Sequence, residues 1–307
     1  MGRYIIRRVL QFIPVFLLTT FLVYALVFAM PGDPIRALAG DRPLSESTVE
    51  SLRARYNLDD PLIIQYLKWL GGYFTGDFGT TFQGRPVGAV IGQRFPVTLR
   101  LAIVAMLIQT LIGITAGILA AVRKGGFVDS LVQVSTVFFV AIPTVAMAFL
   151  TQVIFGVQLG WFPIQGLSQG WYSLILPGAA LASVSTAMAA RLVRTSLIEN
   201  LRADYVRTAT AKGMKRSRVV GRHALRNSLI PVVTFLGADF GGMLGGTIII
   251  EGVFNLPGLG GEVFRAIRAA EGTTVVGIVV IFIIAFVLIN LIVDILYAYL
   301  DPRIRYE

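Results

Sequence analysis

The sequence predicts an all-α polytopic membrane protein with six transmembrane helices and both termini in the cytoplasm. Of its 307 residues, 55% are hydrophobic and only 14% are charged. The mean hydropathy of +0.75 is that of a chain made mainly of membrane spans. Its apolar residues form runs long enough to cross a bilayer as helices, and Lys and Arg gather at the ends of these runs.

Composition also excludes several kinds of chemistry. The chain has no cysteine, which rules out disulfides and thiolate sites, and its single histidine, His223, rules out a metal cluster built from histidines. None of the lysines is followed by Ser or Thr, so the chain has no G-K-[ST] phosphate loop. The net charge of +10 lies at span ends, which topology explains better than nucleic-acid binding. We expect no catalytic residue, metal or cofactor in this chain.

Residues 1–30 are predicted to form a short tail and the first transmembrane helix. Arg3, Arg7 and Arg8 precede an apolar run over residues 9–30 and place the N-terminus inside. A signal peptide also begins with cations, but this run is long enough to span and lacks a small-x-small cleavage site. The sequence Pro-Gly-Asp-Pro at 31–34 ends the helix.

Residues 31–96 are predicted to be an extracytoplasmic segment with short helices. Seven Lys and Arg residues are balanced there by seven acids, which is compatible with an outside location. Ser47-x-x-Glu50 is a possible capping box for one helix, and Asp60-Pro61 opens a second helix. The segment suits contact with an external partner and packing on the spans equally well.

Residues 97–307 are predicted to form a core of five spans, near 97–122, 131–155, 174–193, 229–250 and 273–300. Pro143 interrupts the third span and marks either a kink facing a polar pathway or an ordinary packing kink. The fourth span is rich in small residues, which fits an interior position in the bundle. Asp301-Pro302-Arg303 follows the sixth span on the cytoplasmic side.

The fifth span carries glycines at helical spacing and one acid. A charge such as Asp239 costs on the order of 2.5–3.5 kcal/mol within a membrane helix, so it must face water or a polar partner. That partner is either a polar pathway or a structural hydrogen bond. The glycines fit a loose, permeant-facing helix and tight packing equally. From this span we take Asp239, Gly241, Gly242 and Gly245 as candidate pathway residues.

The connection at residues 194–227 is the most basic part of the chain. Between Arg191 and Arg226 ten cations face only two acids, which places it in the cytoplasm. Within it Ala203, Val206 and Thr210 recur at helical spacing, and Gly213 is a plausible helix end. A short exposed helix here fits a docking element, and it fits equally a segment lying on anionic lipid headgroups.

The run DYVRTATAKGMKRSRVVGRHALRNSLIPVV, at residues 204–233, resembles the cytoplasmic coupling loop of ABC importer permeases. The resemblance is to the B-type subunit of the dipeptide, oligopeptide and nickel family. The general importer signature is Glu-Ala-Ala-x-x-x-Gly, followed by Ile-x-Leu-Pro. Aligned on Gly213, this chain has Arg207-Thr208-Ala209 and a His-Ala-Leu-Arg run at 223–226 instead. The missing glutamate and proline match the peptide-type version of the loop.

This resemblance implies the type I ABC importer permease fold in a bacterial plasma membrane. The chain would be a non-enzymatic subunit that forms half of a pathway for dipeptides or oligopeptides, or for nickel chelates or haem. Its partners would be a second homologous permease, two ATPase subunits that bind ATP and Mg, an extracytoplasmic substrate-binding protein and lipid. An ion-coupled secondary transporter is the alternative from another class; few intramembrane ionisable residues and no evident inverted repeat argue against it. A lipid-binding scaffold is a third class.

The resemblance also implies two sets of site residues. The loop that begins at Glu251 resembles the family's E-x-V-F-x-x-P-G-L-G sequence, which folds back near the pathway mouth, and adds Glu251 and Phe254 to the pathway candidates. The candidate ATPase-coupling residues are Asp204, Tyr205, Arg207, Thr208, Ala209, Ala211, Lys212, Gly213, His223 and Arg226.

Overall fold

The structure of the chain is a computed structural model that describes residues 2–28, 46, 50, 59–81, 83–269 and 271–300. Within these residues the regular structure is helical, apart from one isolated bridge between Thr80 and Pro86. The Pro-Gly-Asp-Pro sequence and the Asp301-Pro302-Arg303 end lie outside the described residues. The predicted helix at Ser47-x-x-Glu50 also lies outside them, except for Glu50.

The long helices are the spans that hydropathy predicts. Five helical stretches are long and apolar enough to cross a membrane in the described part of the chain, and a bent pair makes a sixth if it crosses as one span. The α-helices are α1 Gly2–Phe28, α4 Leu62–Phe74, α5 Val87–Val122, α6 Phe127–Ala141, α7 Thr144–Thr151, α8 Ile175–Leu201, α9 Asp204–Ala211, α10 Arg216–Arg218, α11 Leu225–Val253, α12 Leu259–Arg268 and α13 Gly272–Leu300.

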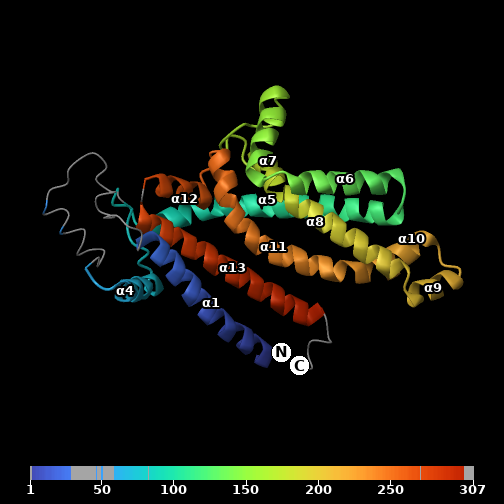
Figure 1. Cartoon of the computed structure of the whole chain (residues 1–307), viewed down its shortest axis with the longest axis horizontal. Coiled ribbons are helices and arrows are strands. Elements are labelled where there is room, and N and C mark those ends of the chain that lie inside the picture. Colours follow the sequence, from blue (N-terminus) through green and yellow to red (C-terminus); the bar gives the residue numbers. More distant parts are fainter. Residues whose placement is uncertain are drawn as a thin grey trace.

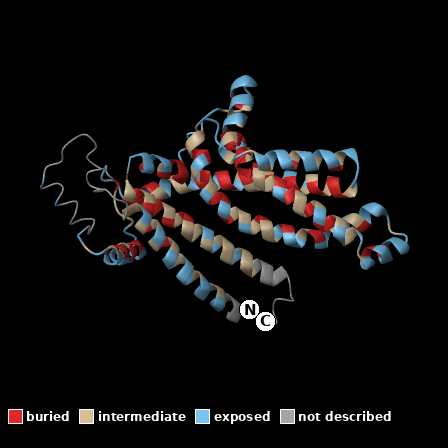
Figure 2. Ribbon diagram, in the orientation of Figure 1, coloured by how far each residue is buried: buried red, intermediate tan, exposed pale blue. Residues whose placement is uncertain are grey.

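The helices form an elongated bundle with α8 at its centre. α8 packs most extensively against α5 and then against α11, while α13 joins α11 to α1 along one flank (Figure 1). In α8, 67% of the most apolar stretch is buried, and Figure 2 shows buried residues along its length. The short helices α9 and α10 mark one end of the bundle, and α12 and α4 lie toward the other. We call these the α9 end and the α12 end.

Small residues allow α8 to approach α5 closely. A Cβ atom added to Gly117 of α5 would lie 2.6 Å from the carbonyl oxygen of Ala190 and 2.5 Å from the Cβ of Val193. One turn earlier, a Cβ on Gly113 would lie 2.9 Å from the Cβ of Ala189. This backbone contact explains why the small residues of the fourth predicted span occupy the interior of the bundle.

The second span begins earlier than its apolar run indicates. α5 starts at Val87 rather than near residue 97, so the helix that contains this span extends ten residues into the segment predicted to be extracytoplasmic. Pro86 precedes the first turn, where the missing N–H of proline costs nothing, and Val87 and Val90 are buried. The polar residues Gln93 and Arg94 hide this start from a reading of hydropathy alone.

The third span is broken rather than kinked. α6 and the helical stretch that begins with α7 meet at an angle of 106°. Ile142 is extended, with φ −92° and ψ 123°, because the residue before a proline avoids the helical region, and Pro143 then begins α7. α7 packs on α8 through the buried residues Met147 and Ala148, and it continues as a π-helical segment at Gln152–Gln158 that projects from the bundle (Figure 1). Pro143 thus interrupts the third span, as predicted, but it does so by a break between two helices and not by a kink within one helix.

α4 packs on the spans, which is one of the two roles that the sequence left open for residues 31–96. The hydroxyl of Tyr66 lies 2.8 Å from that of Thr20 on α1, and the Tyr73 hydroxyl donates a 3.2 Å bond to the carbonyl of Gly277 on α13. Tyr24 and Trp69 complete this aromatic contact. Contact of this segment with an external partner stays a prediction.

Candidate functional site

The predicted short helix in the basic connection is present as α9. It projects at one end of the bundle, beyond α8 and α11 (Figure 1). Gly213 ends it with φ +76°, its N–H bonded to the Thr210 carbonyl at 2.9 Å, while the Met214 N–H reaches the Ala209 carbonyl at 3.4 Å. These two bonds form a Schellman motif, in which glycine adopts the left-handed conformation at no steric cost. Gly213 therefore ends α9, as the sequence indicates.

The buried side of α9 fixes it to the spans. Val206 and Ala209 are 4% and 6% exposed and share a cluster with Ala121 of α5 and Leu197 of α8. Val219 and Ala224, in the π-helical segment that leads into α11, complete this cluster, which we call the α9 base. The ends of three long helices thus meet under α9 and hold it in place.

The three residues at helical spacing do not all face inward. Val206 is buried and Ala203 is half-buried, but Thr210 is exposed and its hydroxyl donates to the Val206 carbonyl at 2.9 Å. Ala209 takes its place inside. Ala209 therefore supports α9 from its own chain, whereas the coupling residues around it face outward.

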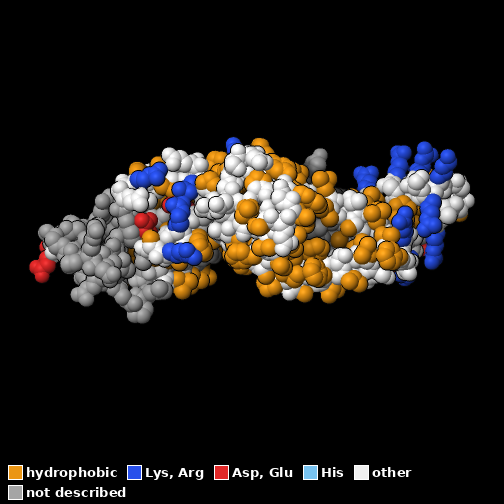
Figure 3. Space-filling model, turned by 90° about the horizontal axis from the view of Figure 1, so that it is seen from above, with side chains coloured by type: hydrophobic (Ala, Val, Ile, Leu, Met, Phe, Trp, Pro, Cys, Tyr) orange, Lys and Arg blue, Asp and Glu red, His pale blue; other side chains and the backbone are white. Residues whose placement is uncertain are grey.

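The outward face of α9 carries the remaining coupling candidates. Arg207 Nη1 lies 3.4 Å from Asp204 Oδ1, with side chains 77% and 95% exposed, so this ion pair contributes little and leaves both groups free to bind a partner. Tyr205 donates a 2.5 Å bond to Asn200 Oδ1. Figure 3 shows Lys and Arg gathered at this end. The other exposed candidates are Thr208, Ala211, Lys212, Gly213 and Arg226.

His223 lies in the connection rather than on α9. It belongs to the π-helical segment Val219–Ala224 and is half-buried, and its Nε2 atom is buried without a hydrogen-bond partner among the described residues. Arg226 follows on the first turn of α11 and is exposed. The structure thus brings His223 to the base of α9 and leaves Arg226 on the outer surface.

The glycines of α11 divide between two faces. Gly242 and Gly245 lie on an exposed face with Ala238 and Ile249, and a Cβ added to either glycine would meet open space. Gly241 is buried, because an added Cβ would lie 3.0 Å from Phe286 and 3.1 Å from Asn290 on α13. Of the predicted pathway glycines, two therefore lie on an open face and one in packing.

Asp239 lies at the edge of this open face. It is half-buried, and its Oδ2 atom has no hydrogen-bond partner within the described ranges. A buried, unpaired carboxylate oxygen is costly in a membrane helix unless water or a polar ligand reaches it. This position supports the polar-pathway reading of Asp239 more than a hydrogen bond within this chain.

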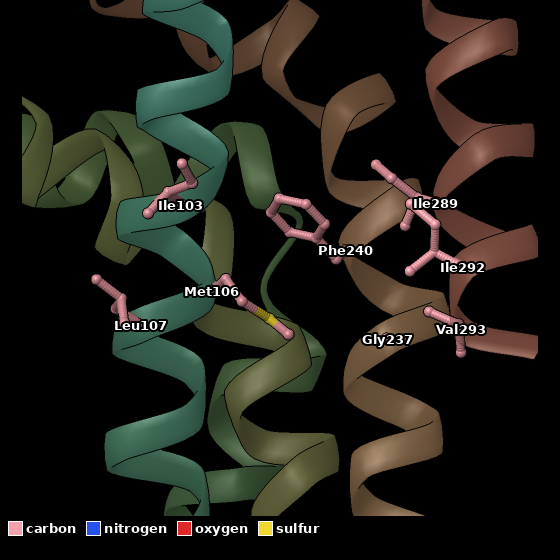
Figure 4. Close-up of a pocket in the computed structure, with 8 residues that line it drawn as sticks. All are labelled: Ile103, Met106, Leu107, Gly237, Phe240, Ile289, Ile292 and Val293. Carbon is pink, nitrogen blue, oxygen red and sulfur yellow. The ribbon is translucent and has the colours of Figure 1, made fainter. Parts of the chain in front are cut away.

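A cavity of about 370 Å³ lies between α5, α11 and α13 (Figure 4). All of its side chains are apolar, so a peptide backbone inside it would lose its hydrogen bonds to water without replacement. The cavity thus fits an apolar occupant and not a polar cargo. It is lined by Ile103, Met106, Leu107, Gly237, Phe240, Ile289, Ile292 and Val293.

Glu251 and Phe254 anchor α12 instead of facing an open surface. Both are buried, at 0% and 1% exposure. Glu251 Oε2 accepts a 2.9 Å bond from the N–H of Gly261 in the first turn of α12, where a carboxylate complements the helix dipole. Phe254 packs in the central cluster with Leu101 and Leu174. The loop does fold back, but these two side chains hold it in place from within.

Asp129 is a functional candidate that the sequence reading missed. It is only 2% exposed and binds Arg194 of α8 through two hydrogen bonds of 2.6 and 2.8 Å. The available signal was an acid at the start of an apolar helix, directly after the Arg-Lys-Gly-Gly turn at 123–126. An acid in such a position requires a cationic partner from another helix.

Long apolar helices surround a buried central helix, and three of them hold an exposed helix from the most basic part of the chain, so the fold is that of a polytopic membrane protein. The family model described as binding-protein-dependent transport system inner membrane component matches residues 113–306, and the N-terminal model of the same systems matches residues 1–102. The chain belongs to this family, the multi-pass inner-membrane permease subunits of ABC importers. In this family the ATPase is a separate subunit, so the chain is not an enzyme.

Individual relatives align with this chain over its whole length. The chain is 40% identical over 309 residues to the glutathione transport system permease protein GsiC of Salmonella paratyphi A (strain ATCC 9150 / SARB42). It is 39% identical over 308 residues to the protein of that name from Escherichia coli (strain K12). Both alignments cover 100% of each chain. The predicted resemblance to the peptide and nickel permease family is confirmed.

Solved structures confirm the fold. A chain of the inward-facing MetNI methionine ABC transporter superposes with a TM-score of 0.58 at 18% sequence identity, and a second crystal form of it gives the same values. The match covers 69% of this chain and 96% of the other. The predicted type I ABC importer permease fold is thus confirmed.

Proposed function

We propose that this chain forms half of the translocation pathway of an importer for small peptides of the size of glutathione. The observation that carries the proposal is the alignment with glutathione permeases from end to end. Glutathione is itself a tripeptide, so its polar, charged backbone poses the same barrier to membrane passage as a dipeptide or oligopeptide does.

The α9 end faces the cytosol in this proposal. Its support is the excess of ten cations over two acids between Arg191 and Arg226, together with Arg7 and Arg8 before the first span. The α12 end then faces a substrate-binding protein on the outer side.

The open face of α11 lines the pathway in the assembled transporter. A single subunit supplies one wall, and a second homologous permease supplies the other. The support is that Gly242 and Gly245 have open space beside them although they lie in the middle of a span. Asp239, at the edge of this face, offers a polar group to a hydrated cargo.

α9 receives force from the ATPase subunits, which bind ATP and Mg. Its exposed residues, Arg207 and Tyr205 among them, contact the ATPase surface. Because Val206 and Ala209 hold α9 on the ends of three spans, a push on α9 moves those helices as a rigid group. Such rigid-body movement converts nucleotide binding into alternating access.

Transport in proteoliposomes tests this function. The transporter is assembled from this chain and its co-encoded partners, and ATP-dependent uptake is measured for labelled glutathione, a dipeptide, a pentapeptide and a nickel chelate. We expect glutathione and short peptides to be taken up and to stimulate ATP hydrolysis. Uptake of the nickel chelate without uptake of any peptide would contradict the proposed cargo.

A further inference from the structure

The carboxylate of Asp129 lies at the junction of three structural elements near the α9 end. It accepts a 2.8 Å bond from the N–H of Gly125, in the turn between α5 and α6, and a 3.1 Å bond from Gln133 on α6. Arg194 of α8 donates from Nε at 2.6 Å and from Nη2 at 2.8 Å. Four donors therefore satisfy one carboxylate, and they tie the α5–α6 turn, α6 and α8 together.

A second hydrogen bond also joins α8 to α6. Arg191 Nε donates a 2.8 Å bond to the hydroxyl of Thr136. Arg191 and Arg194 lie one turn apart on α8, and Thr136 lies two turns beyond Asp129 on α6, so both arginines reach the same face of α6. We call these four residues the α6–α8 clamp.

The clamp supplies the buried contacts of α6. Asp129 and Thr136 are the buried residues of this helix, and both are polar. Most of its apolar side chains point outward, and Val134 and Phe138 are 67% and 57% exposed, while Val128, Val132 and Val140 are half-buried. The fully buried contacts of α6 are therefore polar, and the clamp supplies them. A buried and fully bonded ion pair also has a defined geometry, unlike an exposed pair.

The clamp lies one turn from the α9 base on two helices. Leu197 of the α9 base follows Arg194 by one turn on α8. Ala121 of the same cluster lies at the end of α5, just before the turn that contains Gly125. A movement of α9 thus reaches both sides of the clamp, and α6 extends from it to the bend at Pro143 and α7.

We propose that Asp129, with Arg194 and Arg191, is a positioning residue that makes α6 move together with α8 when α9 is displaced. α7 moves with them, because α6 leads directly into it. The clamp thereby adds the broken span, α6 and α7, to the three helices that meet at the α9 base and move with α9. This inference rests on the proposed role of α9 as the ATPase contact.

The first test compares transport with ATP hydrolysis in the intact transporter. Asp129→Asn keeps the shape of the side chain but removes its charge. We expect the variant complex to assemble in amounts within twofold of the wild type and to retain ATPase activity within threefold. Peptide uptake should fall at least tenfold, so that more ATP is consumed per peptide. Asp129→Glu, which keeps the charge, should recover part of the uptake.

A matched control separates this role from the loss of any ion pair between spans. Asp294 of α13 pairs with Arg8 of α1 at 3.4 Å, far along the chain from α6 and α8. Asp294→Asn should leave the ratio of ATP hydrolysed to peptide transported within twofold of the wild type. If uptake, ATPase activity and assembly of Asp129→Asn all fall in the same proportion, the clamp is only structural and the inference is overturned.

The second test needs no cargo, so it is independent of the proposed substrate. The chain has no cysteine, and spin labels can be attached to cysteines introduced at exposed Ser130 on α6 and Thr195 on α8. In the full transporter we expect one narrow distance distribution, unchanged between the nucleotide-free and ATP-bound states. Asp129→Asn should broaden it in at least one state. A wild-type distance that changes on ATP binding, or an unaltered distribution in the variant, would overturn the inference.

Discussion

At the scale of single residues, backbone conformation and burial decide what each position contributes. Gly213 is needed for its positive φ alone, since nothing lies within 4 Å of an added Cβ. Gly258 is needed for space, because an added Cβ would lie 2.5 Å from the Cδ of Glu251. The two glycines look alike in the sequence, but one ends a helix and the other makes room for a buried carboxylate.

Replacement of Gly213 by valine should uncouple the chain from its ATPase. A non-glycine residue in the left-handed region costs about 1–2 kcal/mol, and β-branching adds to this, so the Schellman end of α9 should open. We expect loss of transport and weaker co-purification of the ATPase. Gly213→Asn is the matched control, since asparagine tolerates positive φ, and it should retain most of the activity. Normal transport by the valine variant would count against α9 as a docking helix.

At the scale of elements, α9 has one face that packs on its own chain and one face that is exposed. The base residues Val206 and Ala209 are buried, whereas Arg207 and Asp204 are almost fully exposed. Stability and coupling can therefore be changed separately on this helix.

Charge reversal at Arg207 should affect coupling without affecting folding. Its exposed pair with Asp204 is worth on the order of 0–1 kcal/mol, so the melting temperature of Arg207→Glu should stay close to that of the wild type. ATP-driven uptake should fall several-fold if this face meets the ATPase. Val206→Ala, which removes about two buried methylene equivalents, should instead lower stability by about 1–2 kcal/mol. Equal thermal destabilisation by both variants would contradict this division.

At the scale of the whole molecule, α11 has one face packed on α13 and one open face, which we propose lines the pathway. Gly241 is buried against α13, while Gly242 opens to the side where a second permease is proposed. Adjacent glycines thus point into different environments of this chain.

Leucine at these two neighbouring positions should give different defects. Gly241→Leu should reduce the amount of folded subunit, because its side chain collides with Phe286 and Asn290. Gly242→Leu should leave the isolated subunit folded and reduce uptake, because it fills the open face. Membrane abundance and peptide uptake distinguish the two outcomes. Reduced abundance of both variants to the same extent would show that the Gly242 face is also packed.

Asp239→Asn tests the polar side of this face. If the carboxylate meets a hydrated cargo or pathway water, uptake should decrease several-fold while assembly stays unchanged. Uptake assays and size-exclusion profiles of the complex measure the two effects. A variant with normal uptake and normal assembly would remove Asp239 from both the pathway and the structural core.

The sequence by itself determined the membrane spans, the family, and the short helix of the basic connection that ends at Gly213, because hydropathy, charge at span ends and glycine chemistry are local properties. Only the tertiary structure decided that Pro143 breaks the third span, that Glu251 and Phe254 are buried, and that Asp129 joins α6 to α8. The physical reason is that apolar residues in a membrane protein face lipid and core alike. Hydrophobic periodicity therefore does not show which side of a span is buried, and only the packing of the helices does.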